Sequence, residues 1–141
     1  MPTVFTRIID GELPGVFVWR DDRCVTFLSI NPVRPGHALV VPRAEVDHWI
    51  DLDEDLAHHL LTVAQVVGRA QQAAFGPARI GLLIAGMEVP HAHLHLIPIR
   101  READLHLSNA APSVSPDELA ANAEAIRAAL RAQGAPGVAS S

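Results

Sequence analysis

Three histidines at alternate positions are the residues of this sequence best suited to chemistry. His91, His93 and His95 stand in the stretch Val-Pro-His-Ala-His-Leu-His-Leu-Ile-Pro, where apolar residues separate them. Side chains of a strand alternate between its faces, so the three imidazoles are expected on one face, with Cα atoms roughly 6.6–7 Å apart. Such a row can bind a transition metal, or its middle histidine can attack phosphorus while the outer two hold phosphate oxygens. A third interpretation is a row of solvated histidines without a function.

The elements that would carry this row follow from apolar periodicity and turn residues. Strands are predicted at residues 16–20, 24–28, 37–41, 79–85 and 91–99, and a short helix or turn at 4–9. A long amphipathic helix is predicted over 51–75, and Ser-Pro-Asp-Glu at 115–118 opens a C-terminal helix that runs to about residue 132. Because strands follow strands without helices between them, the expected fold is α+β: an antiparallel sheet of about five strands with one long helix and a C-terminal helix.

The chain has the length of one domain. It holds 141 residues, of which 49% are hydrophobic, and we predict a single domain over residues 1–133 followed by a disordered tail at 134–141. A sheet covered by only two sizeable helices leaves an edge or a face open. A homodimer is therefore expected to cover it.

Composition excludes several classes of function. The net charge of −5 argues against a nucleic-acid partner, and the absence of lysine excludes Schiff-base chemistry and a P-loop. The apolar runs are too short for a membrane span and the start does not read as a signal peptide, so a cytoplasmic protein without a membrane partner is expected. Cys24 is the single cysteine, which excludes an intramolecular disulfide and a cysteine-based zinc cage, and we expect it to be a small buried apolar residue. His58 and His59 point in different directions on the predicted helix, so no joint site is expected there.

The ordered motifs of this chain resemble the histidine triad (HIT) superfamily. Besides the histidine row, residues 5–14 (Phe-Thr-Arg-Ile-Ile-Asp-Gly-Glu-Leu-Pro) look like the opening helix and turn of that family. Residues 20–28 look like its first hairpin, and residues 35–42 (Pro-Gly-His-Ala-Leu-Val-Val-Pro) are similar to its Pro-Gly-His block. The resemblance covers about residues 3–100 and implies a HIT-like fold.

The resemblance implies a homodimeric hydrolase or transferase that acts on the α-phosphate of nucleoside phosphates, such as nucleoside phosphoramidates or dinucleoside polyphosphates. His93 would form a nucleotidyl-histidine intermediate that releases a nucleoside monophosphate, and His91 and His95 would contact phosphate oxygens, with His37 close by. No cofactor or metal would be needed. The residues implied at the substrate are Phe5, Ile8, Ile9 and Phe27 around the nucleoside, Ser29 and Asn31 near the ribose, and Met87 and Glu88 near the phosphate.

Three of these positions depart from the family pattern. Met87 stands where the family often has glutamine, Glu88 stands where serine or threonine is frequent, and Ser29 replaces the usual Asp or Asn. They support an alternative in which the chain is a catalytically weak nucleotide-binding protein with a regulatory role. A metal-binding protein that uses His91, His93 and His95 is a further alternative.

Many bacterial members also carry a structural zinc. The matching positions here are Thr3, Thr6, Glu45 and His91, so three of the four ligands are missing or hard, and no structural zinc is expected. We expect instead that Glu45 forms a hydrogen bond with His91, which would orient the imidazole and raise its pKa.

Overall fold

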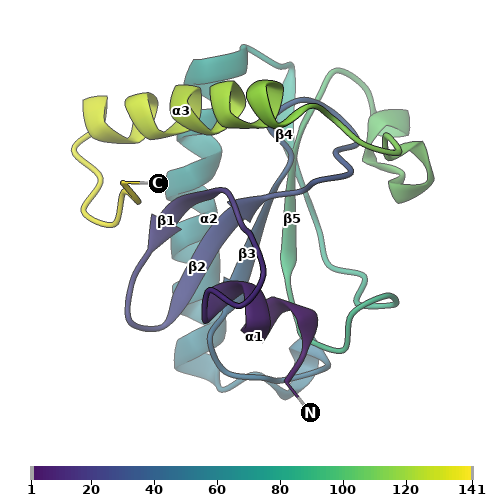
Figure 1. Cartoon of the computed structure of the whole chain (residues 1–141), viewed down its shortest axis with the longest axis vertical. Helices are drawn as coiled ribbons and strands as arrows, with labels where there is room; N and C mark the ends of the chain where they lie inside the picture. Colours follow the sequence, from purple (N-terminus) through teal and green to yellow (C-terminus); the bar gives the residue numbers. More distant parts are fainter. Residues whose placement is uncertain (1, 141) are drawn as a thin grey trace.

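The fold is built on one antiparallel sheet, seen in a computed structural model that describes residues 2–140 (Figure 1). Met1 and Ser141 lie outside the described residues. The strand order is β1-β2-β3-β5-β4, and every neighbouring pair runs antiparallel. This arrangement confirms the predicted α+β class. The strands are β1 (Phe17–Arg20), β2 (Cys24–Leu28), β3 (Ala38–Pro42), β4 (Arg79–Leu83) and β5 (Leu94–Ile99).

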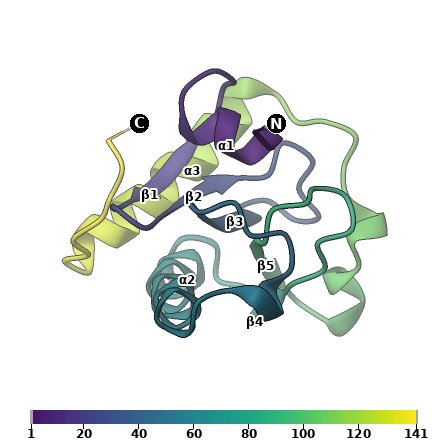
Figure 2. The same cartoon turned by 90° about the horizontal axis from the view of Figure 1, so that it is seen from below.

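Helices lie on both faces of the sheet. The short α1 (Val4–Ile9) covers one face and the long α2 (Glu54–Phe75) covers the other, as Figure 2 shows from below. The C-terminal helix α3 (Pro116–Ala132) crosses near one end of α2 (Figure 1), and the Nε of its Arg127 donates to the Phe17 carbonyl at 2.8 Å. None of the helices within residues 2–140 is long and apolar enough to cross a bilayer. Three 3-10 turns complete the structure: η1 (Trp49–Asp51), η2 (Glu102–Leu105) and η3 (Leu107–Asn109).

Two apolar clusters occupy the two faces, because side chains alternate along each strand. The larger cluster packs α2 and α3 on the sheet and includes Val40, Leu94 and Leu96. The smaller cluster lies under α1 and includes Phe5, Phe27, Leu39 and Val41, with Ile8, Ile9 and Val89 packed against it. His91, His93 and His95 lie on the α1 face.

Local chemistry sets the helix ends. The predicted long helix begins at Glu54 rather than at residue 51, because residues 49–51 form a separate 3-10 turn and Asp53 occupies the N-cap position. It ends at Phe75, and the C-cap Gly76 has a φ of 58°, a left-handed conformation that glycine adopts without a Cβ clash. At α3 the Ser115 side chain accepts from the Glu118 backbone N–H at 3.1 Å, as the capping motif predicts.

The histidine strand and the C-terminal segment both differ from expectation. β5 begins at Leu94, so His95 alone of the three lies within the strand, and His91 and His93 precede it. Residues 137–139 lie along β1 instead of extending free: the Arg20 N–H donates to the Gly137 carbonyl at 2.9 Å, the Ala139 N–H donates to the Val18 carbonyl at 3.0 Å, and the Ala139 side chain is buried. This short segment covers the outer edge of the hairpin.

Candidate functional site

Four buried histidines converge on the α1 face. His37, His91, His93 and His95 are each less than one-tenth exposed. The ring of His93 lies between two others, with centroids 4.8 Å from Phe5 and 4.8 Å from His95. The structure thus brings together all four histidines that the sequence predicted as catalytic.

His93 is held in one tautomer by the backbone. Its Nδ1 lies 2.7 Å from the His91 carbonyl oxygen, which accepts but cannot donate, so Nδ1 carries the proton. Burial lowers the pKa of His93, although the bond to His91 and the charge of Glu88 act in the opposite direction. A neutral ring with its proton on Nδ1 has its lone pair on Nε2, which makes Nε2 a nucleophile.

A second chain of hydrogen bonds fixes His95. The Val33 backbone N–H donates to His37 Nδ1 at 3.1 Å, so the proton of neutral His37 sits on Nε2. That Nε2 lies 2.9 Å from His95 Nδ1, which must therefore accept and leaves the His95 proton on Nε2. Burial lowers the pKa of His37 to about 3 and that of His95 to about 4, so both rings are neutral near pH 7. The site thus pairs a lone pair on His93 with an N–H donor on His95.

His91 has no ring nitrogen free for a ligand. Its Nε2 lies 2.7 Å from the Pro42 carbonyl and its Nδ1 lies 2.7 Å from the Thr3 hydroxyl. Its side chain is fully buried. This geometry does not fit the expectation that His91 contacts phosphate oxygens, nor a metal site made of all three histidines. Its carbonyl instead holds the His93 ring.

The predicted direct hydrogen bond between Glu45 and His91 is wrong, because Thr3 stands between them. Glu45 Oε1 accepts from the Thr3 backbone N–H at 2.8 Å and from the Thr6 hydroxyl at 2.5 Å. These two bonds lower the pKa of Glu45, and the bond from Thr6 has the larger effect. The positions that match the family's zinc ligands therefore bind one another. Two hydroxyls, one carboxylate and an imidazole with both nitrogens engaged do not fit zinc.

The residues predicted around the nucleoside line the same face. Phe5 packs edge-on to Phe27 at 5.6 Å between centroids, and Ile8 and Ile9 join this apolar cluster. The Ser29 backbone N–H donates to the His37 carbonyl at 3.0 Å, which places Ser29 beside the histidines. Asn31 follows, with its backbone N–H on the Ser29 hydroxyl at 3.2 Å and its side chain on the Pro112 carbonyl.

The segment between β4 and the histidines is exposed. Met87 is 91% exposed, and Glu88 is exposed beside it. The negative charge of Glu88 reaches the site, since it acts to raise the pKa of His93. A carboxylate therefore lies within electrostatic range of the His93 ring.

Sequence reasoning missed the groups that fix the tautomers. Thr3 touches His91 directly, yet it drew attention only as a position without a zinc ligand. The Val33 N–H and the Pro42 carbonyl are backbone groups, for which no residue type gives a signal.

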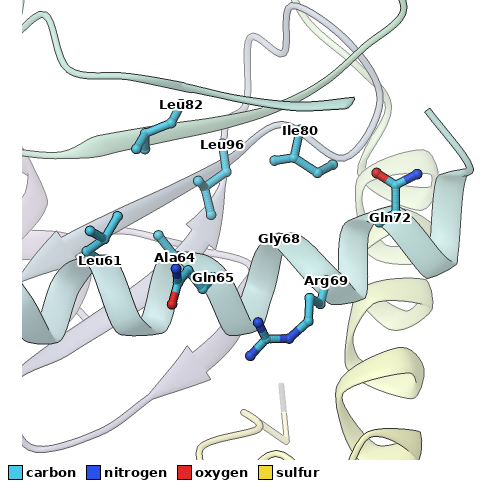
Figure 3. A pocket seen from close by; sticks show the side chains of 9 residues that line it. All are labelled: Leu61, Ala64, Gln65, Gly68, Arg69, Gln72, Ile80, Leu82 and Leu96. Carbon is cyan, nitrogen blue, oxygen red and sulfur yellow. The ribbon is translucent and has the colours of Figure 1, made fainter. Parts of the chain in front are cut away.

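A cavity lies on the opposite face of the sheet, where α2 faces β4. Its volume is about 370 Å³ and its lining includes Leu61, Ile80 and Leu82 (Figure 3). It is separated from the histidines by the sheet.

Comparison with known proteins identifies the family of this chain. An uncharacterised HIT-like protein of Saccharolobus solfataricus is 34% identical over 100 residues, which cover 67% of this chain and 72% of the relative. The adenylylsulfatase HINT3 of Arabidopsis thaliana is 30% identical over 106 residues, 72% of this chain and 53% of the plant protein. The crystal structure of a HIT-like protein from Bartonella henselae, described as involved in cell-cycle regulation, aligns with a TM-score of 0.80 at 28% identity, covering 90% of this chain and 95% of that one. The family model described as the HIT domain matches residues 10–102, and the chain therefore belongs to the HIT domain family.

Proposed function

We propose that this protein is a nucleotide hydrolase that cleaves the bond between the α-phosphorus of a nucleoside phosphate and its leaving group, through a nucleotidyl intermediate on His93. One observation carries the proposal. The His93 Nδ1 proton is directed to the His91 carbonyl at 2.7 Å, which leaves the Nε2 lone pair beside the ring of His95. Membership of the HIT family supports a nucleotide-binding or hydrolase kind of function, and the related plant protein is an adenylylsulfatase by name.

The chemistry divides into two displacements at phosphorus. In the first, the His93 Nε2 lone pair forms a bond to the α-phosphorus, and the bond to the leaving nitrogen or oxygen breaks. The leaving group keeps the bonding pair and takes a proton from solvent. In the second, water adds to phosphorus, the bond to Nε2 breaks, the water proton passes to solvent, and the nucleoside monophosphate departs.

The other histidines would act on the same phosphate from fixed positions. The His95 Nε2–H would donate to a phosphate oxygen and stabilise the charge that grows there in the transition state. His37 would act through His95, whose tautomer it sets, and His91 would act through its carbonyl on His93. The nucleoside would lie against Phe5, Ile8, Ile9 and Phe27, with Ser29 and Asn31 at the ribose and with Met87 and Glu88 at the phosphate.

Adenosine 5′-phosphoramidate is the substrate for the first test, with the parent chain and a His93→Ala variant measured together. Release of AMP by the parent and none by the variant is expected, and acid quenching during turnover should trap AMP on the parent chain alone. If the parent binds AMP but neither chain releases it from any nucleoside phosphoramidate or dinucleoside polyphosphate, the hydrolase proposal fails. The exposed Glu88 carboxylate favours the second candidate in that case, a nucleotide-binding protein without turnover.

A homodimer across β4 completes the proposal. β4 is the last strand of the sheet, so one of its edges has no neighbouring strand among residues 2–140. Leu82 of this strand and Leu61 of α2 are 44% and 45% exposed and border the cavity of Figure 3. A second copy of β4 would pair with this edge and cover the leucines. A Leu82→Asp variant is expected to elute as a monomer in light scattering where the parent elutes as a dimer; a monomeric parent would contradict the proposal.

A further inference from the structure

Three metal-ligating side chains meet on the face of the sheet opposite the histidines. Asp21 lies in the turn between β1 and β2, Cys24 begins β2, and His59 reaches them from α2. One ligand atom from each, a carboxylate oxygen, the Sγ and a ring nitrogen, lies within 4.8 Å of the other two. His59 Nε2 is 2.8 Å and Cys24 Sγ is 3.6 Å from Asp21 Oδ2.

The carboxylate at the centre of this group is held by its own partners. Asp21 Oδ1 accepts from the backbone N–H groups of Arg23 and Cys24 at 2.7 and 2.8 Å. Oδ2 accepts from the Trp19 Nε1–H at 2.8 Å. Burial acts to raise the pKa of Asp21, but the hydrogen bonds outweigh it and keep that pKa well below the usual range. The carboxylate is therefore charged and fixed in direction before anything binds.

We propose that Asp21, Cys24 and His59 form a binding site for one divalent ion of borderline softness, Zn²⁺ being the natural occupant. A thiolate, an imidazole and a carboxylate are the ligands that Zn²⁺ takes in proteins, and three of them with one open position make a four-coordinate centre with a bound water. Cys24 is fully buried, whereas the side chains of Asp21 and His59 remain 19% and 25% exposed. The open position and the route for the ion therefore face solvent between these two residues.

Binding exchanges protons for the metal. Burial, assisted by the charge of Asp21, raises the pKa of the Cys24 thiol, so the metal-free protein holds it protonated. Coordination breaks the S–H bond, forms the metal–sulfur bond and releases that proton to water. The His59 Nε2–H that donates to Asp21 must also lose its proton, to Nδ1 or to water, before the Nε2 lone pair binds the metal. Bonds of 2.0–2.3 Å to a tetrahedral ion require ligand atoms roughly 3.3–3.8 Å apart. The separations of 2.8 and 3.6 Å from Asp21 Oδ2, and of no more than 4.8 Å between the remaining pair, lie close to this range.

The site is independent of the proposed hydrolase. Cys24 belongs to the apolar cluster under α2, while His93 packs on Phe5 of the other cluster. An ion here would tie the β1–β2 turn to α2, which joins two segments 38 positions apart. Its expected effect is a higher unfolding temperature of the protein.

Titration of the metal-free full chain with Co²⁺ tests the proposal. Cys24 is the single cysteine, so a near-ultraviolet thiolate-to-cobalt charge-transfer band can come from Cys24 alone, and histidine-bound cobalt does not produce it. We expect this band at one equivalent, its displacement by Zn²⁺, and its persistence in a His93→Ala variant. Cys24→Ser should abolish it.

A second variant keeps the test decisive if Cys24→Ser does not fold. His59→Gln retains an N–H donor for Asp21 and retains the thiol, but it removes the imidazole; we expect it to bind Co²⁺ at least about tenfold more weakly. Absence of the charge-transfer band from the folded parent at saturating Co²⁺ overturns the proposal. So does an unchanged affinity in His59→Gln.

Discussion

The hydroxyl of Thr3 lies 2.7 Å from Nδ1 of His91, a residue 88 positions further along the chain. Through this bond the N-cap residue of α1 contacts His91, the residue that holds the His93 ring. The His91 carbonyl in turn fixes the His93 ring, and Glu45 holds the helix start through the Thr3 N–H and the Thr6 hydroxyl. We infer that α1 positions the proposed nucleophile as well as lining the apolar wall with Phe5.

Replacement of Thr3 by valine tests this arrangement, because valine matches the shape of threonine and lacks the hydroxyl. His91 Nδ1 then loses its partner, and loss of one such bond weakens the packing of this region by about 1 kcal/mol. We expect kcat for AMP release to fall roughly tenfold as His93 becomes less well aligned, with KM nearly unchanged. Steady-state kinetics on adenosine 5′-phosphoramidate measures both.

Thr3→Ser is the matched control for that variant. It keeps the donor to His91 and the cap on the Thr6 N–H, so kcat should return to within about twofold of the parent value. Long-range proton–nitrogen spectra of the imidazoles give a second readout: the His93 proton on Nδ1 and the His95 proton on Nε2 in the parent. Equal kcat values for the valine and serine variants would show that Thr3 does not position His93.

The pH dependence of the rate follows from the lowered pKa of His93. Burial disfavours the charged ring, so the Nε2 lone pair persists below pH 6.5, the ordinary pKa of histidine. A nucleoside phosphodiester is a suitable substrate because its charge is constant in this range. With it, kcat/KM should fall to half of its plateau value only below pH 6.5. Since the charge of Glu88 acts to raise that pKa, Glu88→Gln should move the midpoint lower still. A midpoint at or above 6.5 would contradict the burial argument.

Stability should depend on pH through His37 and His95. Their folded pKa values of about 3 and about 4 lie below the unfolded value of 6.5. The unfolded chain therefore binds more protons in this window, and the free energy of unfolding falls as pH drops below 6.5 and is level above it. Carboxyl groups with lowered pKa start from ordinary values of 3.8 and 4.5, so the range from pH 6.5 to about 5 reports the histidines. Urea unfolding at pH 7.5, 6.5 and 5 should show the decline, and a smaller one in His37→Gln.

Much of the fold was predictable because local patterns and tertiary packing agree. Residues 24–28 were expected as a strand and form β2, and Ser115 caps α3 where the Ser-Pro-Asp-Glu pattern indicates. The start of β5 was not predictable in the same way. Alternating residues from 91 onward describe extended backbone, but a strand also needs a partner, and the pairing with β3 begins only at Leu94.

The candidate site was predictable in its residue types and not in its hydrogen bonds. The spacing of His91, His93 and His95 places them on one face, and in the structure His91 and His93 both pack on Phe5 while His93 packs on His95. Which nitrogen carries the proton in His93, His37 and His95 depends on the carbonyl of His91 and on the Val33 N–H, backbone groups that any residue other than proline would supply. The same reason explains the error at Glu45, since a charged residue near a histidine suggests a direct contact that Thr3 makes instead.

Glu88 provides the last prediction, which concerns the leaving group. Its carboxylate is exposed and acts electrostatically on His93, so it should repel a leaving group that carries negative charge and tolerate a neutral or cationic amine. The parent protein should therefore prefer adenosine phosphoramidates to dinucleoside polyphosphates. Glu88→Gln should raise kcat/KM for the polyphosphate by about two- to tenfold, while kcat/KM for the phosphoramidate changes little. Added salt should narrow this difference, because exposed charges are screened. Asp117→Asn is the matched control, since it also removes one exposed negative charge but lies on α3 rather than beside the histidines. If Glu88→Gln alters both substrates equally, the carboxylate does not select the leaving group and acts only through the pKa of His93.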